Sequence, residues 1–144
     1  MKIQIHRIDQ TLPLPKYETS GSFGFDFVAR EDTEIKPRET GLIPGNIIVK
    51  CPPNLALLIL PRSSTFRKTK LIFPHSAGLI DRDYCGTNDE IMIQVLSFSD
   101  EPILIKKGER IAQGLFVQTQ SVAFEEISAE FLKSNSRGGF GSTG

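Results

Sequence analysis

Residues 78–86, GLIDRDYCG, hold a carboxylate and a phenol close together in one short stretch. The apolar residues Leu79 and Ile80 stop at Asp81, and Tyr84 follows three positions later. This pattern predicts a β-hairpin that buries its apolar strand residues and leaves Asp81 and Tyr84 at the rim of a pocket. A carboxylate fixed at such a rim can orient a water molecule and accept its proton. Taken alone, the stretch fits better with a simple turn that Asp81 caps.

Four other stretches carry polar or glycine-rich chemistry far from this one along the chain. Each of them alone indicates no more than a turn or a capped loop. Their significance depends on what the fold places together. They are GFDF with Asp26, PRSS with Arg62, Ser63 and Ser64, GERIAQ with Gln113, and the C-terminal SNSRGGFGSTG.

The size and charge of the chain narrow the possible functions. At 144 residues it fits a single domain of ordinary size, for which oligomerisation would add stability. Lysines plus arginines and aspartates plus glutamates both number 17, so the formal net charge is zero. This balance gives no indication of a nucleic-acid partner, and any anion site must be local.

The N-terminal residues and the cysteines indicate where the protein works. MKIQIHRI alternates instead of running apolar, and no apolar stretch is long enough to span a bilayer, so we expect a cytoplasmic protein without a membrane partner. Cys51 and Cys85 are expected to stay reduced there. With no CxxC motif and only two histidines, a zinc site held by the protein is not expected.

Short alternating or apolar stretches separated by turn residues predict an all-β chain, a sandwich or a barrel. Residues 55–60 are continuously apolar and predict a fully buried strand. The other strands are expected in residues 2–8, 24–29, 31–41 (two strands), 41–49 (split at Pro44 and Gly45), 91–96 and 111–117.

The end of the chain departs from this pattern. Residues 124–133 place Phe124, Ile127 and Phe131 on one helical face, which predicts an amphipathic helix, although in an all-β setting a strand and turn would also fit. From Ser134 onward the chain has many glycines and few apolar residues, and its composition alone predicts a disordered end.

Taken in order, the five stretches resemble the five motifs of the homotrimeric dUTPase family across nearly the whole chain. YETSGSFGFDFVA resembles the first motif, PRSS the second, GLIDRDYCG the third, GERIAQ the fourth and RGGFGSTG the fifth. The resemblance implies an all-β fold, a distorted jelly-roll or β-barrel, over residues 1–133, followed by a flexible glycine-rich lid over residues 134–144. It also implies a homotrimer whose active sites are shared between subunits.

The family's reaction is the hydrolysis of dUTP to dUMP and diphosphate, which limits uracil in DNA and supplies dUMP for dTMP synthesis. Asp81 would hold the water that attacks the α-phosphate and accept its proton, because an aspartate is ionised at neutral pH. Tyr84 would press its ring on the deoxyribose, where a ribose 2′-hydroxyl would clash. Backbone groups of Gly78 and Ile80 would read uracil, and cytosine would leave buried polar groups unpaired.

Residues of the other motifs would hold the phosphates. The resemblance implies that Arg62 supplies positive charge and that Ser63, Ser64 and Gln113 bond phosphate oxygens. Asp26 would contact the water shell of a Mg²⁺ ion held mainly by the triphosphate. Such an indirect contact suits Mg²⁺, which keeps several of its waters.

The C-terminal tail would close over the bound nucleotide. Phe140 would stack on uracil, Arg137 would pair with the terminal phosphate, and amides around Gly139, Gly141 and Ser142 would donate to phosphate oxygens. The family motif usually reads RGxGGFG, whereas NSRGGFG places Arg137 directly before the glycine pair. Either the tail is shorter and Arg137 still serves, or the phosphate clamp is weaker than in relatives.

The chain also departs from the commonest family pattern elsewhere. Phe23 stands where the first motif usually has a small residue, Ser64 where the second often has glycine, and Cys85 where the third often has arginine. The region of Asn88 and Asp89 is longer than usual. We expect this extra length in the returning turn of the hairpin.

The related dCTP deaminase family, including bifunctional dCTP deaminase/dUTPase enzymes, is the main alternative. Arg67 falls where that family places a second arginine. The stretch HSAG, which begins at His75, resembles the HxTA run of that family. Deamination there needs a glutamate in the strand after the hairpin, where this chain has Ile91 and Met92, with Glu90 on the turn side.

A non-catalytic trimeric β module is a third alternative. Loss of Asp81, Arg62 or the tail would mark such a module, and all three are present. The role of His75 stays open, because it could hydrogen-bond the base or could be packed or solvated.

Overall fold

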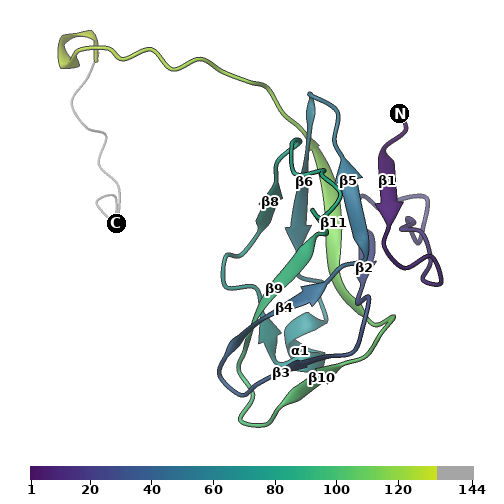
Figure 1. Cartoon of the computed structure of the whole chain (residues 1–144). Coiled ribbons are helices and arrows are strands. Elements are labelled where there is room, and N and C mark those ends of the chain that lie inside the picture. Colours follow the sequence, from purple (N-terminus) through teal and green to yellow (C-terminus); the bar gives the residue numbers. More distant parts are fainter. Residues whose placement is uncertain (133–144) are drawn as a thin grey trace.

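The computed structural model describes residues 1–132 and shows a chain built mainly of short β-strands (Figure 1). No helix among these residues is long and apolar enough to cross a membrane. The strands are β1 (Gln4–Arg7), β2 (Phe25–Val28), β3 (Thr33–Ile35), β4 (Thr40–Pro44), β5 (Ile47–Lys50), β6 (Leu55–Leu60), β7 (Leu71–Ile72), β8 (Gly78–Ile80), β9 (Met92–Ser97), β10 (Ile103–Ile105) and β11 (Arg110–Gln118), and the helical turns are α1 (Thr65–Thr69) and η1 (Ala129–Phe131).

The strands pair antiparallel in four sheets, which confirms the all-β prediction. The strand orders are β1–β5, β10–β3, β2–β11–β6–β8 and β4–β9–β7. Within residues 1–132 no sheet closes into a barrel. The short strands instead send alternate side chains into one shared core, which includes Phe27, Ile43, Leu57 and Ile93.

Strand β11 is the element that positions the motifs. It lies between β2 and β6, so that Gln113 is opposite Asp26 on one side and opposite Leu60 on the other. A register irregularity lies between Arg110 and Ala112 at the start of the strand. The first, second and fourth motifs therefore meet at one end of this sheet.

Strand β6 has the predicted bounds but is not fully buried. Leu57 and Ile59 are buried, whereas the other four residues are half-buried. Only Leu57 and Ile59 are buried on the core face of the strand, because successive side chains point to opposite faces of a sheet. The continuous apolar run hid this alternation.

The predicted hairpin at residues 78–86 is wrong in its pairing. Strand β8 pairs with β6, and the next strand, β9, joins β4 and β7 instead. The chain is drawn away from β8 because Ile91 donates its N–H to the Ile47 carbonyl at 3.0 Å and accepts one from Gly45 at 2.9 Å. Residues 81–91 therefore form a loop between strands of two sheets.

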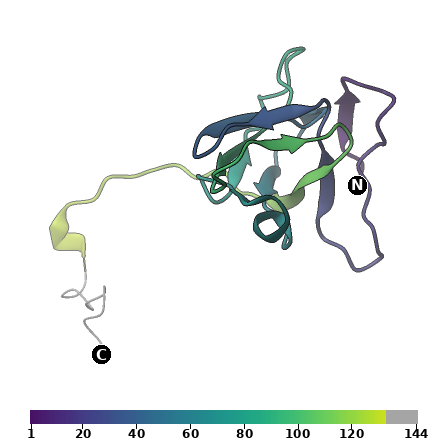
Figure 2. The same ribbon diagram turned by 90° about the horizontal axis from the view of Figure 1, so that it is seen from below.

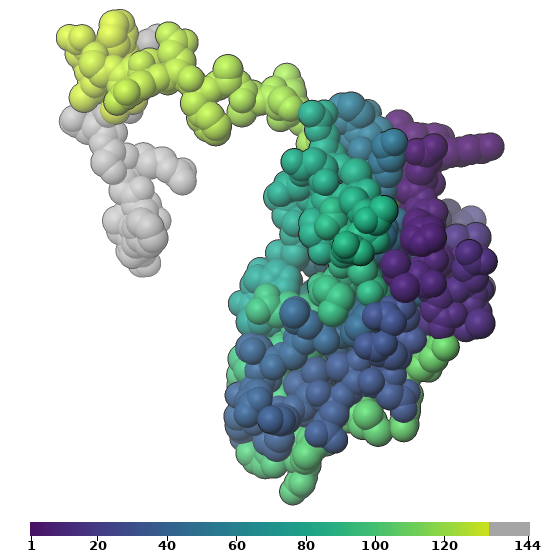
Figure 3. All heavy atoms as spheres, viewed as in Figure 1, coloured from purple at the N-terminus to yellow at the C-terminus, as the bar shows by residue number. Residues whose placement is uncertain are grey.

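Residues 119–132, here called the arm, begin against the body, where Thr119 donates its N–H to the Asn54 carbonyl at 3.0 Å. The rest of the arm runs clear of the strands in two perpendicular views (Figures 2 and 3). Every residue of the arm is exposed, including Phe124 at 96%. The amphipathic helix predicted for residues 124–133 is wrong, since only the short turn η1 forms among the described residues. A helical apolar face gains little stability without a surface to pack on.

Residues 133–144 lie outside the described residues. The tail residues Arg137, Gly139, Phe140, Gly141 and Ser142, and the boundary between residues 1–133 and a lid over residues 134–144, therefore stay predictions.

Gly114 lets β11 approach the aromatic core, and its replacement tests this packing. A Cβ there would lie 2.8 Å from Phe27 Cε2 and 2.9 Å from Phe25 Cε1. We expect Gly114→Ala to lower the free energy of unfolding by about 1–3 kcal/mol in chemical denaturation, because rings must shift in a packed core. Gly21→Ala is the matched control, since no heavy atom lies within 4 Å of its added Cβ. Equal stability of the two variants would contradict this account.

Candidate functional site

Asp26, Arg62 and Arg110 form an ion-pair group, here called the arginine cluster, at the end of β6. Arg62 Nε donates to Asp26 Oδ1 at 2.7 Å, and Arg110 Nη1 donates to Asp26 Oδ2 at 3.0 Å. Asp26 alternates with the buried Phe25 and Phe27 on β2, so its carboxylate lies on the face away from the core.

The arginine cluster keeps N–H donors for an anionic ligand although acidic side chains pair with both arginines. The hydrogen bond to Asp26 is the main cause that raises the pKa of Arg110, and Glu18 Oε1 lies 3.7 Å from Arg110 Nη1. A guanidinium carries five N–H donors, so the bonds to Asp26 leave donors for phosphate oxygens. The sequence interpretation missed Arg110, although it stands within GERIAQ and begins β11.

Reciprocal hydrogen bonds fix the loop after β6. Arg62 donates its N–H to Thr65 Oγ1 at 3.0 Å, and Thr65 donates its N–H to the Arg62 carbonyl at 2.9 Å. Ser63 is exposed and Ser64 half-buried beside a small hollow that Arg62 and Arg110 also line. The buried Thr65, which the sequence interpretation missed, thus holds both serines next to the arginine cluster.

Gln113 has a positioning contact in this structure. Its Nε2 donates to the Pro61 carbonyl at 2.9 Å, so the side chain reaches from β11 to the loop after β6. The structure therefore brings Asp26, Arg62, Ser63, Ser64 and Gln113 together at one end of β6, as the motif order implied.

Asp81 lies at the opposite end of β6. Strand β8 pairs Ile80 with Leu57, which places the exposed Asp81 beside Ala56. A hollow of about 320 Å³ opens there, lined by Asp81, Ile80, Ala56 and Thr119 among others. A carboxylate at such a rim can reach a water molecule in the hollow.

Tyr84 lies in the loop that Asp81 begins, and Gly78 begins the same strand β8, opposite Ile59. Tyr84 donates its N–H to the Asp81 carbonyl at 3.2 Å and its hydroxyl to the Glu90 carbonyl at 3.1 Å. His75 is exposed and stacks on Phe73, and its Nε2 would lie 3.0 Å from a Cβ added to Gly78. The imidazole therefore stands beside the strand that was predicted to read the base.

The two groups of residues are far apart within one chain. Asp81 lies beside Ala56 of β6. Arg62 is six residues after Ala56 in the sequence, just beyond the end of β6. At about 3.3 Å per strand residue the separation is on the order of 20 Å. One chain therefore does not bring Asp81 to the arginine cluster.

The described residues fit an indirectly held metal ion better than a protein cage. Residues 1–132 contain no group of three or more His, Cys, Asp or Glu side chains that could hold a metal. Both oxygens of Asp26 are paired with arginines. A Mg²⁺ ion that is held by a polyphosphate and keeps its waters is compatible with this arrangement.

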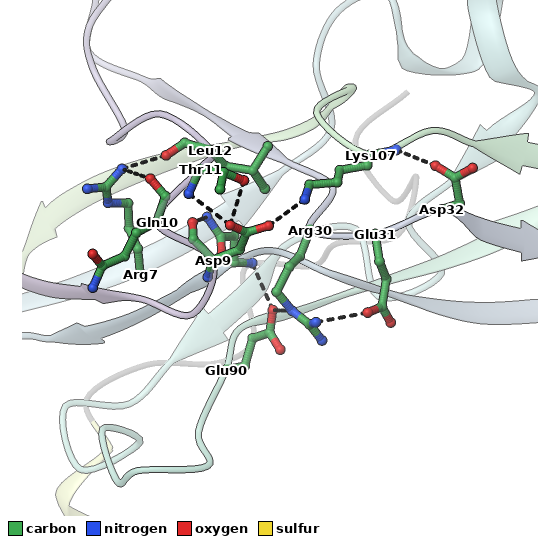
Figure 4. A network of polar contacts seen from close by, with 11 residues as sticks. Arg7, Asp9, Gln10, Thr11, Leu12, Arg30, Glu31, Asp32, Glu90 and Lys107 are labelled. Carbon is green, nitrogen blue, oxygen red and sulfur yellow. Dashed lines mark hydrogen bonds and ion pairs between the residues drawn. The ribbon is translucent and has the colours of Figure 1, made fainter.

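Glu90, which was weighed as a deaminase glutamate, has a structural role. Its Oε1 accepts hydrogen bonds from Arg30 Nε at 2.8 Å and from the Asn46 N–H at 2.9 Å (Figure 4). Glu90 Oε1 is therefore used to hold Arg30 and Asn46 in place.

Comparisons with known proteins agree with the motif order. The family model described as dUTPase matches residues 10–144. The deoxyuridine 5′-triphosphate nucleotidohydrolase of Dictyoglomus turgidum is 38% identical, with 100% of this chain and 99% of the relative covered. That of Actinobacillus succinogenes is 41% identical, with 100% and 95% covered. The crystal structure of dUTPase from Streptococcus mutans has a TM-score of 0.76 at 29% identity, covering 83% of this chain and 98% of that one.

Asp26→Asn tests whether the carboxylate holds the arginine cluster together. We expect a loss of about 1–3 kcal/mol in the free energy of unfolding, because both arginines lose a charged acceptor in a partly buried place. Asp100→Asn is the control, since Asp100 pairs with Arg38 at 2.6 Å on the open surface and its loss should cost under about 1 kcal/mol. Equal losses in denaturation experiments would contradict the proposed importance of the cluster.

Proposed function

The chain belongs to the dUTPase family and hydrolyses dUTP to dUMP and diphosphate, and from this premise we propose that Asp81 is the general base of the reaction. The observation that supports this role is the exposed carboxylate at the end of β8, on the rim of a hollow. The water oxygen forms a bond to the α-phosphorus, the bond to the bridging oxygen breaks, and Asp81 accepts the water proton.

The arginine cluster and the loop after β6 hold the phosphates in this proposal. Arg62 and Arg110 donate charged N–H groups to phosphate oxygens, and Ser63 and Ser64 donate hydroxyls. Gln113 keeps the loop in place through the Pro61 carbonyl. When bound to the triphosphate, Mg²⁺ supplies further positive charge, and Asp26 faces its water shell.

The nucleoside lies against β8 and the loop after it. Gly78 and Ile80 offer backbone donors and acceptors to uracil, and Tyr84 lies against the deoxyribose. A site that hydrogen-bonds one base rejects another strongly, because its polar groups are left unpaired. His75, beside Gly78, is placed to border the same base.

A homotrimer with shared active sites would bring Asp81 of one chain to the arginine cluster of another. Their separation of about 20 Å along β6 supports this arrangement. The arm supports it as well, because Val122, Phe124 and Phe131 are exposed by two thirds or more. Apolar surface of this kind marks a place where another chain binds.

The tail keeps the role that the fifth motif implies. Phe140 would stack on uracil, Arg137 would pair with the terminal phosphate, and amides of Gly139, Gly141 and Ser142 would donate to phosphate oxygens. The sequence RGGFGSTG, which resembles the fifth family motif, supports this proposal.

Asp81→Asn tests the general base. We expect kcat for dUTP with Mg²⁺ to fall by about 10²–10⁴-fold, because the amide cannot accept the water proton. The affinity for a non-hydrolysable dUTP analogue should be kept.

Asp83→Asn is the matched control, since Asp83 lies in the same loop and accepts the Cys85 N–H at 2.9 Å through its backbone carbonyl, which the substitution keeps. This control should keep its turnover. Near-normal turnover of Asp81→Asn would remove Asp81 from the role of base.

A further inference from the structure

The hydroxyl of Tyr84 reaches an anchored residue. It donates to the Glu90 carbonyl at 3.1 Å. The Glu90 side chain in turn accepts two hydrogen bonds on Oε1, from Arg30 Nε at 2.8 Å and from the Asn46 N–H at 2.9 Å. We call the ion pair of Arg30 with Glu90 the Arg30–Glu90 clamp.

The clamp is partly buried and rigidly held. The Arg30 and Glu90 side chains are 26% and 14% exposed. The Arg30 N–H donates to the Pro44 carbonyl at 2.9 Å, and Glu31 pairs with Arg30 Nη1 at 2.8 Å (Figure 4). The hydrogen bond that Arg30 donates to Glu90 is the main cause that raises the pKa of Arg30.

Asn46, the other partner of Glu90, is itself fixed in place. It is 1% exposed and has a positive φ of 68°. Its amide bonds Asp9 twice, accepting from the Asp9 N–H at 2.7 Å and donating to the Asp9 carbonyl at 3.1 Å. Asp9 is paired in turn with Lys107, which keeps the pKa of Asp9 well below its usual range.

The loop that carries Tyr84 has few ties to this frame. Among the described residues, the other hydrogen bonds of residues 81–89 are local: Tyr84 N–H to Asp81, Cys85 N–H to Asp83, and both Gly86 N–H and Asp89 N–H within the turn at residues 86–89. Within that part of the chain the loop joins the body only at its end, through the Glu90 side chain and through the backbone of Ile91. Residues 81–84 are all exposed. The orientation of the Tyr84 ring therefore depends on where the Glu90 carbonyl is held.

We propose that Arg30 and Glu90 are positioning residues that fix the Tyr84 ring and so determine the selectivity for deoxyribose over ribose. The proposal rests on the proposed contact of Tyr84 with the sugar. A ring excludes a 2′-hydroxyl only if it cannot swing aside, since a shift of about 1 Å opens the room that the hydroxyl needs. Neither Arg30 nor Glu90 has to touch the nucleotide.

Arg30→Met tests the clamp, because methionine keeps an apolar stem and removes the guanidinium. We expect the ratio of kcat/KM for dUTP to that for UTP to fall about tenfold. This is the fold-change that the loss of one stabilising hydrogen bond produces. The kcat for dUTP should stay within about twofold, since the base and the arginine cluster are unchanged. A split of this kind is not expected from a general loss of stability.

Two further variants serve as controls. Arg38→Met removes the surface ion pair with Asp100 and should leave the ratio unchanged. Glu90→Gln keeps Oε1 as an acceptor for Asn46 and Arg30, so its ratio should fall less than that of Glu90→Ala. If Arg30→Met does not fold, comparison of Glu90→Gln with Glu90→Ala still tests the clamp.

A double-mutant cycle decides whether the clamp acts through Tyr84. Tyr84→Phe should lower the ratio as much as Arg30→Met, and the double variant should lower it no further. An unchanged ratio in Arg30→Met, or additive losses in the double variant, would overturn the clamp while leaving the role of Tyr84 in place. An unchanged ratio in Tyr84→Ala would overturn the role of Tyr84 itself, and the clamp with it.

Discussion

The pairing of β11 with β2 on one side and β6 on the other is the constraint on which the site depends. It sets Gln113 opposite both Asp26 and Leu60. Backbone pairing alone therefore brings together residues from three motifs that are distant in the sequence. The close approach needs Gly114, where any side chain would meet the rings of Phe25 and Phe27. The same strand β6 carries β8 at its other end, and this placement separates the phosphate residues from the proposed base.

The two ends of β6 are held in different ways. At the proposed phosphate end, Asp26 of β2 joins Arg110 of β11 and Arg62 of the loop after β6, so the charged groups are fixed before any substrate arrives. At the nucleoside end, residues 81–84 of the loop after β8 are exposed, Tyr84 bonds the Glu90 carbonyl, and the loop is tied to the body at Glu90 and Ile91. In the proposed function, selectivity for the sugar would depend on the anchoring of a loop, whereas phosphate binding would depend on the sheet itself.

Alternation along the chain predicted most strands because burial of every second side chain is a local property. Strand β2, Phe25–Val28, lies within the alternating stretch 24–29, whereas β6 was predicted from its continuous apolar run. Strand partners could not be predicted in this way, so β8 was expected to pair forward and pairs with β6 instead. The helix expected at residues 124–133 depended on a surface that the described residues do not provide. Motif order predicted that Asp26, Arg62 and Gln113 come together, whereas the contacts of Arg110 and Glu90 depend on side-chain geometry that motifs do not encode.

The central claim is that a complete active site takes Asp81 and Arg62 from different chains. The direct test refolds Asp81→Asn and Arg62→Met chains together in equal amounts and measures dUTP hydrolysis, after each variant alone has been shown to be inactive. Random association of equal subunits would leave about a quarter of the shared sites with both residues intact, so about a quarter of wild-type activity is expected. Mixtures as inactive as the separate variants would contradict the claim, because a site built within one chain never regains both residues.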